Sequence, residues 1–332
     1  MNIRSENKDE YQKYLERIHN KKSTSDQVIY ELVNEATGSI PISKTKLMTG
    51  EVNEVYDIML PNMESIIVRI HTDVKPVFLQ EKWAIEQCRE KGIPVPTILL
   101  IKHIDGGDSI VSICIQEKLK GDTLERGKVN FWDLDRNLLR TLMLESGELL
   151  ARMHTIYVEG FGNLDKEGKG KYKTFRGMML EKPKHVGEYI KLAKNQGIPE
   201  RDMNFALKTI TKNERRFENV KPVFNHGDFA PKHIMYEGEV ITGILDFGDV
   251  LGHSPVFDFA RWEYWYGPSI AFDWLREGYS DKSIFTEDYQ ELSRLIQLDM
   301  SLGTISWYGK EKYNKGIKHG VDRMNEMLKF YK

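Results

Sequence analysis

The chain of 332 residues has little cysteine, no long apolar segment and almost no net charge. Its two cysteines, Cys88 and Cys114, have no CxxC partner, which excludes a zinc cluster, and we expect no disulfide framework. No apolar run approaches the ~20 residues that span a bilayer, and the polar N-terminus lacks the apolar core of a secretory signal. A net charge of -2 argues against a general nucleic-acid binder. These absences predict a cytoplasmic protein with reduced thiols that binds neither nucleic acid nor membrane.

The N-terminal third has the periodicities of a small antiparallel sheet with one helix after its third strand. Apolar residues at spacings of three and four indicate helix, and alternation with a period of two indicates strand. The predicted elements in chain order are a helix over 8–36, strands over 46–60 and 65–71, a helix over 78–91, and strands over 97–103 and 109–116.

From about residue 120 the pattern becomes mainly helical, with an apolar stripe that ends at His154 and further helices predicted over 178–220 and 269–330. The segment around Glu117 lacks the Ser/Pro-rich character of a flexible linker, so we interpret it as a crossover strand. We therefore expect two lobes, residues 1–117 and residues 118–332, in an α+β fold.

Two acidic loops stand on either side of a predicted hairpin near residue 240. Asp228 lies in His226-Gly227-Asp228-Phe229, just before a strand-like run, where its carboxylate would be free to accept a hydrogen bond from a substrate hydroxyl. The hairpin returns the chain to Asp246, so that His233 and Asp246 would share one end and could face one divalent ion. We expect His226 to order the loop, and Gly248 to permit a sharp turn after Asp246.

These loops resemble those of the aminoglycoside phosphotransferase family, most of all its hygromycin- and macrolide-type members. Further landmarks follow in order from about residue 46 to 262: Gly92-Ile93-Pro94-Val95-Pro96, Leu119-Lys120-Gly121, Leu150-Ala151-Arg152-Met153-His154, Gly160-Phe161-Gly162 and Val256-Phe257-Asp258-Phe259-Ala260. The resemblance implies a protein-kinase-like fold with an antiparallel-sheet N-lobe and a mainly helical C-lobe. It also implies transfer of phosphate from ATP or GTP, with Mg²⁺, to the hydroxyl of a small molecule.

By the same resemblance, Asp228 would be the catalytic residue and Asp246 the principal metal ligand. The residues implied for the nucleotide are Gly50 in a positioning hairpin, Arg69 on the α/β-phosphates, Glu81 as the partner of Arg69, and Glu117 and Leu119 as hinge groups for the base. Two positions depart from the commonest pattern of the family. His233 replaces Asn, which leaves its metal role open because Mg²⁺ prefers oxygen. Arg69 replaces Lys and keeps the positive charge.

The resemblance also implies that the segment from Phe257 to Trp274 helps form the acceptor pocket. This segment is rich in aromatic residues and includes Glu263 and Asp273, which are the candidate acceptor contacts. Packing of helices in the C-lobe is the favoured explanation for any single one of these rings. Lys232 has two interpretations, a contact to the transferred phosphoryl group or a surface loop lysine.

The leading hypothesis is a phosphotransferase acting on an aminoglycoside-like or other glycoside antibiotic, and so an antibiotic-resistance enzyme. A kinase of a metabolic alcohol or amino sugar is the alternative acceptor class. A non-catalytic nucleotide-binding protein would retain the loops without turnover, and a metallohydrolase would leave the N-terminal pattern unexplained. A Walker-type NTPase is excluded because no GxxxxGK[ST] loop occurs. The sequence does not define the oligomeric state.

Overall fold

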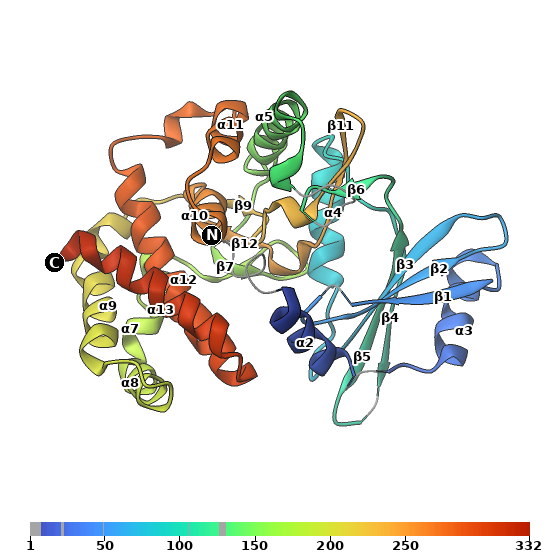
Figure 1. Ribbon diagram of the computed structural model, residues 1–332, viewed down its shortest axis with the longest axis horizontal. Helices are drawn as coiled ribbons and strands as arrows, with labels where there is room; N and C mark the ends of the chain where they lie inside the picture. Colours follow the sequence, from blue (N-terminus) through green and yellow to red (C-terminus); the bar gives the residue numbers. More distant parts are fainter. Residues whose placement is uncertain (1–7, 21–22, 49, 106, 126–130) are drawn as a thin grey trace.

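The computed structural model describes residues 8–20, 23–48, 50–105, 107–125 and 131–332. A five-stranded sheet lies on one side of the molecule, and most helices gather on the other (Figure 1). The sheet order is β1-β2-β3-β5-β4, and every neighbouring pair is antiparallel. Its strands are β1 (Ser43–Leu47), β2 (Glu54–Met59), β3 (Ser65–Asp73), β4 (Ile98–Asp105) and β5 (Ile110–Glu117). The predicted α+β architecture is confirmed.

One face of this sheet is covered by α3 (Asp26–Thr37), which begins at the N-cap residue Ser25 and ends at Gly38 with φ of 70°. Alternate residues of β3, such as Val68 and Ile70, turn their apolar side chains into the small core that α3 closes. The helix predicted over 8–36 is therefore two helices, since α2 (Lys8–His19) ends before the cap of α3. The strand predicted over 46–60 is likewise two strands, β1 and β2, joined by a loop.

Helix α4 (Leu79–Glu90) follows β3, as the sequence predicts. Its buried residues Ala84, Ile85 and Cys88 belong to the large core of the helical part, and so do Tyr14 and Leu15 of α2. Both helices therefore connect the sheet to the helical lobe.

The crossover strand predicted around Glu117 to Gly121 is wrong in its residues, since β5 ends at Glu117 and residues 118–121 are not strand. A short strand follows, β6 (Asp122–Thr123), which pairs with β10 in the three-stranded sheet β11-β10-β6. Gly121 has φ of 89°, and a Cβ there would lie 2.0 Å from the carbonyl oxygen of Tyr236, so only glycine allows this approach. The expected boundary between residues 117 and 118 stays a prediction.

The second lobe contains α5 and a series of shorter elements around one apolar core. The apolar stripe of α5 (Arg136–Met153) is buried, as its spacing predicts. The remaining helices are α6 (Phe175–Met179), α7 (Glu181–Lys184), α8 (Val186–Asn195), α9 (Glu200–Lys212), α10 (Val256–Tyr266), α11 (Ile270–Gly278), α12 (Tyr289–Glu311) and α13 (Asn314–Leu328). The remaining strands are β7 (Phe161–Leu164), β8 (Gly170–Tyr172), β9 (Val223–Asn225), β10 (Ile234–Glu237), β11 (Val240–Ile244) and β12 (Leu251–His253).

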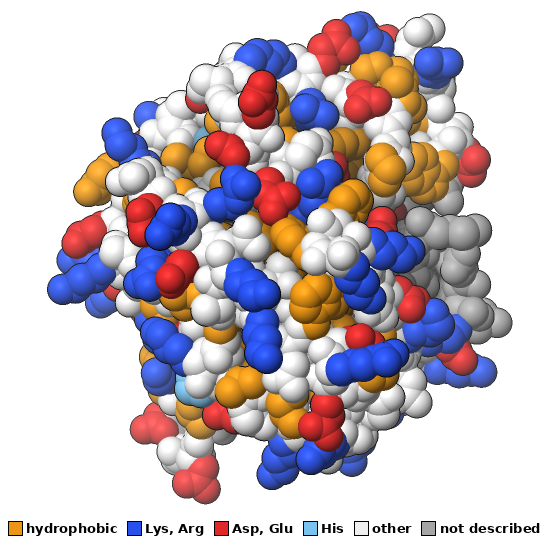
Figure 2. Space-filling model, turned by 90° about the vertical axis from the view of Figure 1, so that its left-hand side faces the viewer, with side chains coloured by type: hydrophobic (Ala, Val, Ile, Leu, Met, Phe, Trp, Pro, Cys, Tyr) orange, Lys and Arg blue, Asp and Glu red, His pale blue; other side chains and the backbone are white. Residues whose placement is uncertain are grey.

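Four of these strands form the sheet β8-β7-β12-β9, in which β9 and β12 are antiparallel neighbours. On the outer face of the helical lobe, basic and acidic side chains intermingle and hydrophobic ones lie scattered (Figure 2). None of the described helices is both long and apolar enough to cross a membrane.

Candidate active site

The loop that follows β9 is held by a carboxylate from the helical lobe. The backbone N–H groups of His226 and Gly227 donate to the two oxygens of Asp258, at 2.9 and 3.0 Å. Asp258 is buried in the first turn of α10. Because both oxygens are used on successive amides, Asp258 fixes the backbone that presents Asp228.

His226 joins this loop to the one that carries Asp246. Its Nε2 lies 3.0 Å from the carbonyl oxygen of Leu245, and its Nδ1 accepts the N–H of Asp228 at 3.2 Å. A carbonyl only accepts, so the proton is on Nε2, which leaves Nδ1 free to accept. The predicted loop-ordering role of His226 is confirmed.

Gly227 brings the same two loops into backbone contact. Its φ is 85°, and a Cβ at this position would lie 1.9 Å from the carbonyl oxygen of Asp249. Any other residue would combine an unfavourable backbone conformation with a collision. The approach between the loops therefore depends on this glycine.

Asp228 is surrounded by donors. Nε and one terminal nitrogen of Arg261 lie 3.0 and 2.9 Å from Oδ1, while Lys232 and Nε2 of His233, the latter at 3.1 Å, contact Oδ2. Burial works against ionisation, but Arg261 and Lys232 hold the pKa of Asp228 well below its usual range. A carboxylate has about four acceptor positions. The expectation of a free carboxylate is therefore wrong: an acceptor hydroxyl must displace one of these donors.

Asp246 is presented differently. It follows β11 with φ of 66° and ψ of 68°, in the left-handed region that a non-glycine residue rarely adopts. Its side chain is 47% exposed and lies 3.4 Å from Arg69 and 3.6 Å from His233. Burial of the site opposes ionisation, but His233 and Arg69 lower the pKa of Asp246. The sharp turn is made by Asp246 itself, which corrects the role expected for Gly248.

Arg69 of β3 and Glu81 of α4 form the predicted pair, at 2.5 and 3.3 Å between nitrogens and oxygens. Burial alone would lower the pKa of Arg69, but Glu81 and Asp246 raise it, so the guanidinium stays charged. Gly248 leaves room for the side chain of Glu81, since a Cβ added at residue 248 would lie 3.3 Å from Oε1 of Glu81. The contact of these residues with a nucleotide stays a prediction.

The chemistry of the donor set fits Mg²⁺ at Asp246, which offers a half-exposed carboxylate. Among the described residues no group of three or more His, Cys, Asp and Glu side chains is arranged to hold a metal ion. Mg²⁺ is typically held by one or two carboxylates together with phosphates and water, so a complete protein cage is not required. His233 fits less well. Burial lowers its pKa to about 4, and its Nε2 faces the carboxylates of Asp228 and Asp246, which makes that nitrogen a donor.

The other residues expected at the nucleotide lie at the edges of the sheet. Gly50 is in the loop between β1 and β2, and the preceding Thr49 lies outside the described residues. Glu117 ends β5, and its N–H donates to the carbonyl of Thr97 at 2.8 Å, so this N–H is already used within the protein and is not available to a nucleotide base. Leu119 packs toward β11, where a Cβ on Gly243 would meet its side chain.

The two expected acceptor contacts are not brought to Asp228. Glu263 accepts from Ser293 and Gln297 of α12, at 2.9 and 3.4 Å, so its carboxylate serves helix packing. Asp273 is exposed on α11. Sequence reasoning missed Arg261, although its position three residues after Asp258 puts both on one face of α10.

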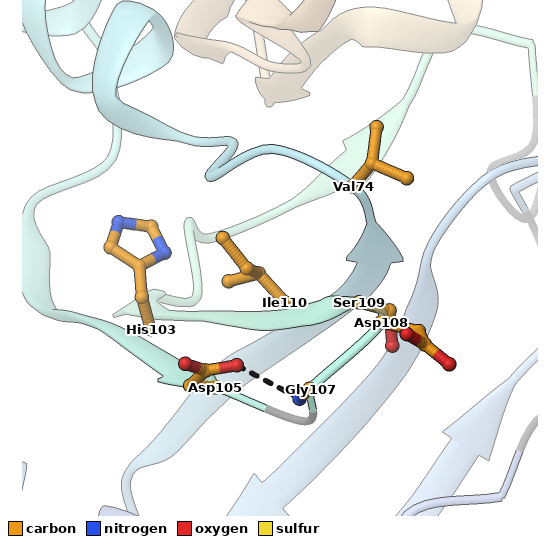
Figure 3. A pocket seen from close by; sticks show the side chains of 7 residues that line it. All are labelled: Val74, His103, Asp105, Gly107, Asp108, Ser109 and Ile110. Carbon is orange, nitrogen blue, oxygen red and sulfur yellow. Dashed lines mark hydrogen bonds between the residues drawn. The ribbon is translucent and has the colours of Figure 1, made fainter.

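A surface pocket lies away from this cluster, at the turn between β4 and β5 (Figure 3). Its lining includes Val74, His103 and Ile110, and Asp105 accepts the N–H of Gly107 at 2.8 Å. Ile110 begins β5 and Glu117 ends it, so the pocket is at the opposite end of that strand from the expected hinge.

Comparison with known proteins bears on the family and the fold. The sequence profile of the phosphotransferase enzyme family matches residues 45–293. An apo crystal structure of a thermostable mutant of aminoglycoside phosphotransferase APH(4)-Ia has a TM-score of 0.72 and 14% identity, covering 91% of this chain and 99% of that one. A ternary complex of a thermostable mutant of that enzyme with ADP and hygromycin B has a TM-score of 0.69 and 15% identity, covering 91% and 98%.

A putative fructosamine-3-kinase from Thermobifida fusca is also similar, with a TM-score of 0.64 and 16% identity, covering 92% of this chain and all of that one (100%). A search of curated protein sequences gives no match. At these identities the structural likeness establishes the fold, while the profile covers most of the sequence. The chain therefore belongs to the phosphotransferase enzyme family, whose members transfer phosphate to small molecules.

Proposed function

We propose that this enzyme transfers the γ-phosphate of ATP or GTP to a hydroxyl of an aminoglycoside-like or other glycoside antibiotic. The observation that carries the proposal is the juxtaposition of an ionised Asp228 with a half-exposed Asp246 and the Arg69–Glu81 pair. In this division of labour, residues 1–117 bind the donor and residues 118–332 carry catalysis and bind the acceptor. The similar fold that binds ADP and hygromycin B supports this acceptor class.

The reaction would use Asp228 to orient the acceptor. The acceptor hydroxyl displaces one of the donors on Asp228 and donates a hydrogen bond to the carboxylate. Its oxygen attacks the γ-phosphorus in line as the bond from that phosphorus to the β-bridging oxygen breaks. The proton passes to Asp228 late, because its low pKa makes it a weak base that orients rather than abstracts.

Asp246 would hold Mg²⁺, which when bound neutralises charge on the donor phosphates. Arg69, fixed by Glu81, would balance charge at the α/β-phosphates through a planar group suited to two oxygens. Lys232 contacts Asp228, which supports a role at the catalytic loop rather than on the surface.

A metabolic alcohol or amino sugar is the second candidate acceptor. It is favoured by the two cations, Arg261 and Lys232, that flank Asp228, because they would repel an acceptor with several positive charges more strongly than an uncharged or singly charged one. The similarity to a putative fructosamine-3-kinase agrees with this candidate.

The test is Mg²⁺-dependent transfer of labelled phosphate from ATP and from GTP to a panel of aminoglycosides, hygromycin-type compounds, macrolides, amino sugars and simple alcohols. A phosphorylated product identifies the acceptor class and the donor. Donor binding without transfer to any compound would favour a non-catalytic binding protein. Failure to bind either nucleotide would overturn the proposal.

A further inference from the structure

One carboxylate in the loop between β1 and β2 gathers three tyrosines. Glu51 accepts hydrogen bonds from the hydroxyls of Tyr11 at 2.8 Å, Tyr308 at 3.3 Å and Tyr14 at 3.4 Å. Tyr11 and Tyr14 belong to α2, whereas Tyr308 belongs to α12 of the helical lobe. The loop of residues 50–53, here called the β1–β2 loop, is therefore tied to both ends of the chain.

The end of α2 holds the same loop through its backbone. The ring of His19 is buried, and its Nε2 lies 2.6 Å from the carbonyl oxygen of Gly50. That oxygen can only accept, so Nε2 carries the proton. Just beyond, the backbone N–H and the hydroxyl of Thr24 both donate to Glu54 at 3.1 Å, where β2 begins.

Helix α2 is itself fixed to the helical lobe. The ring of Tyr14 stacks on Tyr313 with centroids 4.5 Å apart, and Arg17 donates to the carbonyl of Glu311 at 2.8 Å. Lys315 and Glu10 add an ion pair at 2.5 Å. In Figure 1, α2 lies between the ends of α12 and α13 and the sheet. The β1–β2 loop is thus attached across the junction of the lobes and not to its own strands alone.

We propose that α2 is a clasp that positions the β1–β2 loop for the donor nucleotide. The inference rests on the proposed function, in which Gly50 belongs to the nucleotide site. A loop supported only by its two strands would sample many positions, and donor binding would have to order it. The contacts from α2 and α12 order it beforehand, so that donor binding loses less conformational entropy.

The clasp acts on the donor side alone. Glu51 accepts from the three tyrosines, whereas Asp228 at the acceptor side accepts from Arg261 and Lys232. Positioning of this kind strengthens ground-state and transition-state binding equally, so its loss raises KM for the donor and leaves kcat nearly unchanged. A purely structural role would lower stability without that selective change.

The experiment compares Tyr11→Phe, Tyr308→Phe and Glu51→Ala with the wild type. Each Phe variant keeps its ring and loses a bond to a carboxylate, so we expect donor KM to rise about three- to ten-fold. Glu51→Ala loses all three bonds and should have the largest rise, and Glu51→Gln, which keeps an acceptor oxygen, should recover part of it. Acceptor KM and kcat should stay within about two-fold.

Glu10→Gln is the matched control. It weakens an ion pair of the same helix with α13 that does not touch the loop, and exposed pairs contribute little. Its donor KM should equal that of the wild type. In the double variant Tyr11→Phe/Glu51→Ala, the rise in donor KM should not exceed that of Glu51→Ala, because the bond that Tyr11→Phe removes is already lost in Glu51→Ala.

The clasp would be overturned by variants that lose thermal stability yet keep the wild-type donor KM, or that raise donor and acceptor KM alike. Glu51→Ala keeps the test valid if a tyrosine variant fails to fold, since Glu51 lies in a loop. A wild type that binds no nucleotide defeats the proposed function instead, so the two failures are distinguishable.

Discussion

The loop of Asp228 and the loop of Asp246 present the same functional group in opposite ways. The side chain of Asp228 is 13% exposed and contacts three basic side chains, whereas that of Asp246 is 47% exposed and has longer contacts. Asp228 is held by bonds made within the protein, and Asp246 is held by its backbone conformation. The first arrangement fixes a carboxylate in its charged state, and the second leaves one accessible to an external ligand.

The two loops nevertheless depend on each other. Gly227 packs against the carbonyl of Asp249, and His226 donates to Leu245, the residue before Asp246. The left-handed conformation of Asp246 costs about 1–3 kcal/mol, and such a conformation persists only where its surroundings hold it. The backbone contacts from the Asp228 loop supply those surroundings. Asp228 and Asp246 therefore differ in the surroundings of their side chains, while the backbones of their two loops hold each other in place.

The largest expected effect is on transfer in Asp228→Asn. The amide keeps the shape of the carboxylate but cannot accept the hydroxyl proton, so we expect the transfer rate to fall ~10²–10⁴-fold. Affinity for the donor nucleotide should change little, because Asp228 contacts Arg261 and Lys232 and not the residues of the five-stranded sheet that we expect to bind the nucleotide. Single-turnover transfer and titration with a fluorescent nucleotide measure the two separately. Near-normal turnover would refute the catalytic assignment.

Asp246→Asn, unlike Asp228→Asn, should weaken binding of the donor nucleotide. Loss of a formal charge at the half-exposed position should weaken Mg²⁺-dependent nucleotide binding ~10–100-fold and slow transfer as well. Nucleotide binding measured with and without Mg²⁺ isolates the metal-dependent part. If Asp246→Asn kept wild-type binding in Mg²⁺ while Asp228→Asn lost it, the roles of the two loops would be reversed.

Most of this arrangement was predictable from the sequence because it depends on local patterns. Periodicity gave the strands around residue 68 and the helix over 78–91, and the interval between Asp228 and Asp246 predicted a hairpin between them. The break near Ser25 was missed because an apolar period continues on both sides of it, and only the N-cap marks it.

Other features depend on contacts that no local pattern contains. Arg261 reaches Asp228 only because α10 docks its first turn on the catalytic loop through Asp258. The turn assigned to Gly248 belongs to Asp246 because tertiary contacts impose a conformation that residue preferences would give to glycine. Both misses lie at the site itself, where local preference and final structure conflict.

Gly227→Ala tests the dependence of the two loops on each other. The new Cβ would meet the carbonyl of Asp249, and the left-handed backbone adds its own penalty, so we expect a loss of ~2–4 kcal/mol in the free energy of unfolding. Donor binding at Asp246 and transfer at Asp228 should both decline. Gly238→Ala, which has a similar φ but an open surrounding, is the control and should lose only about 1 kcal/mol. Equal losses in the two variants would contradict the close approach.

The smallest effect is expected from a change in the sheet β8-β7-β12-β9. In this sheet β9 leads to Asp228, and β12 follows the Asp246 loop. Burial lowers the pKa of His253 in β12 to about 3, and its Nδ1 accepts the N–H of Ser254 at 2.8 Å. Unfolded histidine has a pKa of about 6.5. Between these values the unfolded chain binds a proton that the folded one does not, so stability contributed by neutral His253 is present above about pH 6.5 and is lost as the pH falls.

His253→Asn keeps an acceptor for Ser254 but cannot be protonated in this range. We expect the wild type to lose about 1–2 kcal/mol more than the variant between pH 7 and pH 5, in urea unfolding followed at both values. Transfer at pH 7 should be similar in the two proteins, since the ring contacts Phe175 and Phe257 rather than either loop. Parallel pH dependences would place the acid sensitivity in the loops themselves and not in the strands that support them, because His233, whose pKa burial lowers to about 4, loses stability in the same direction over this pH range.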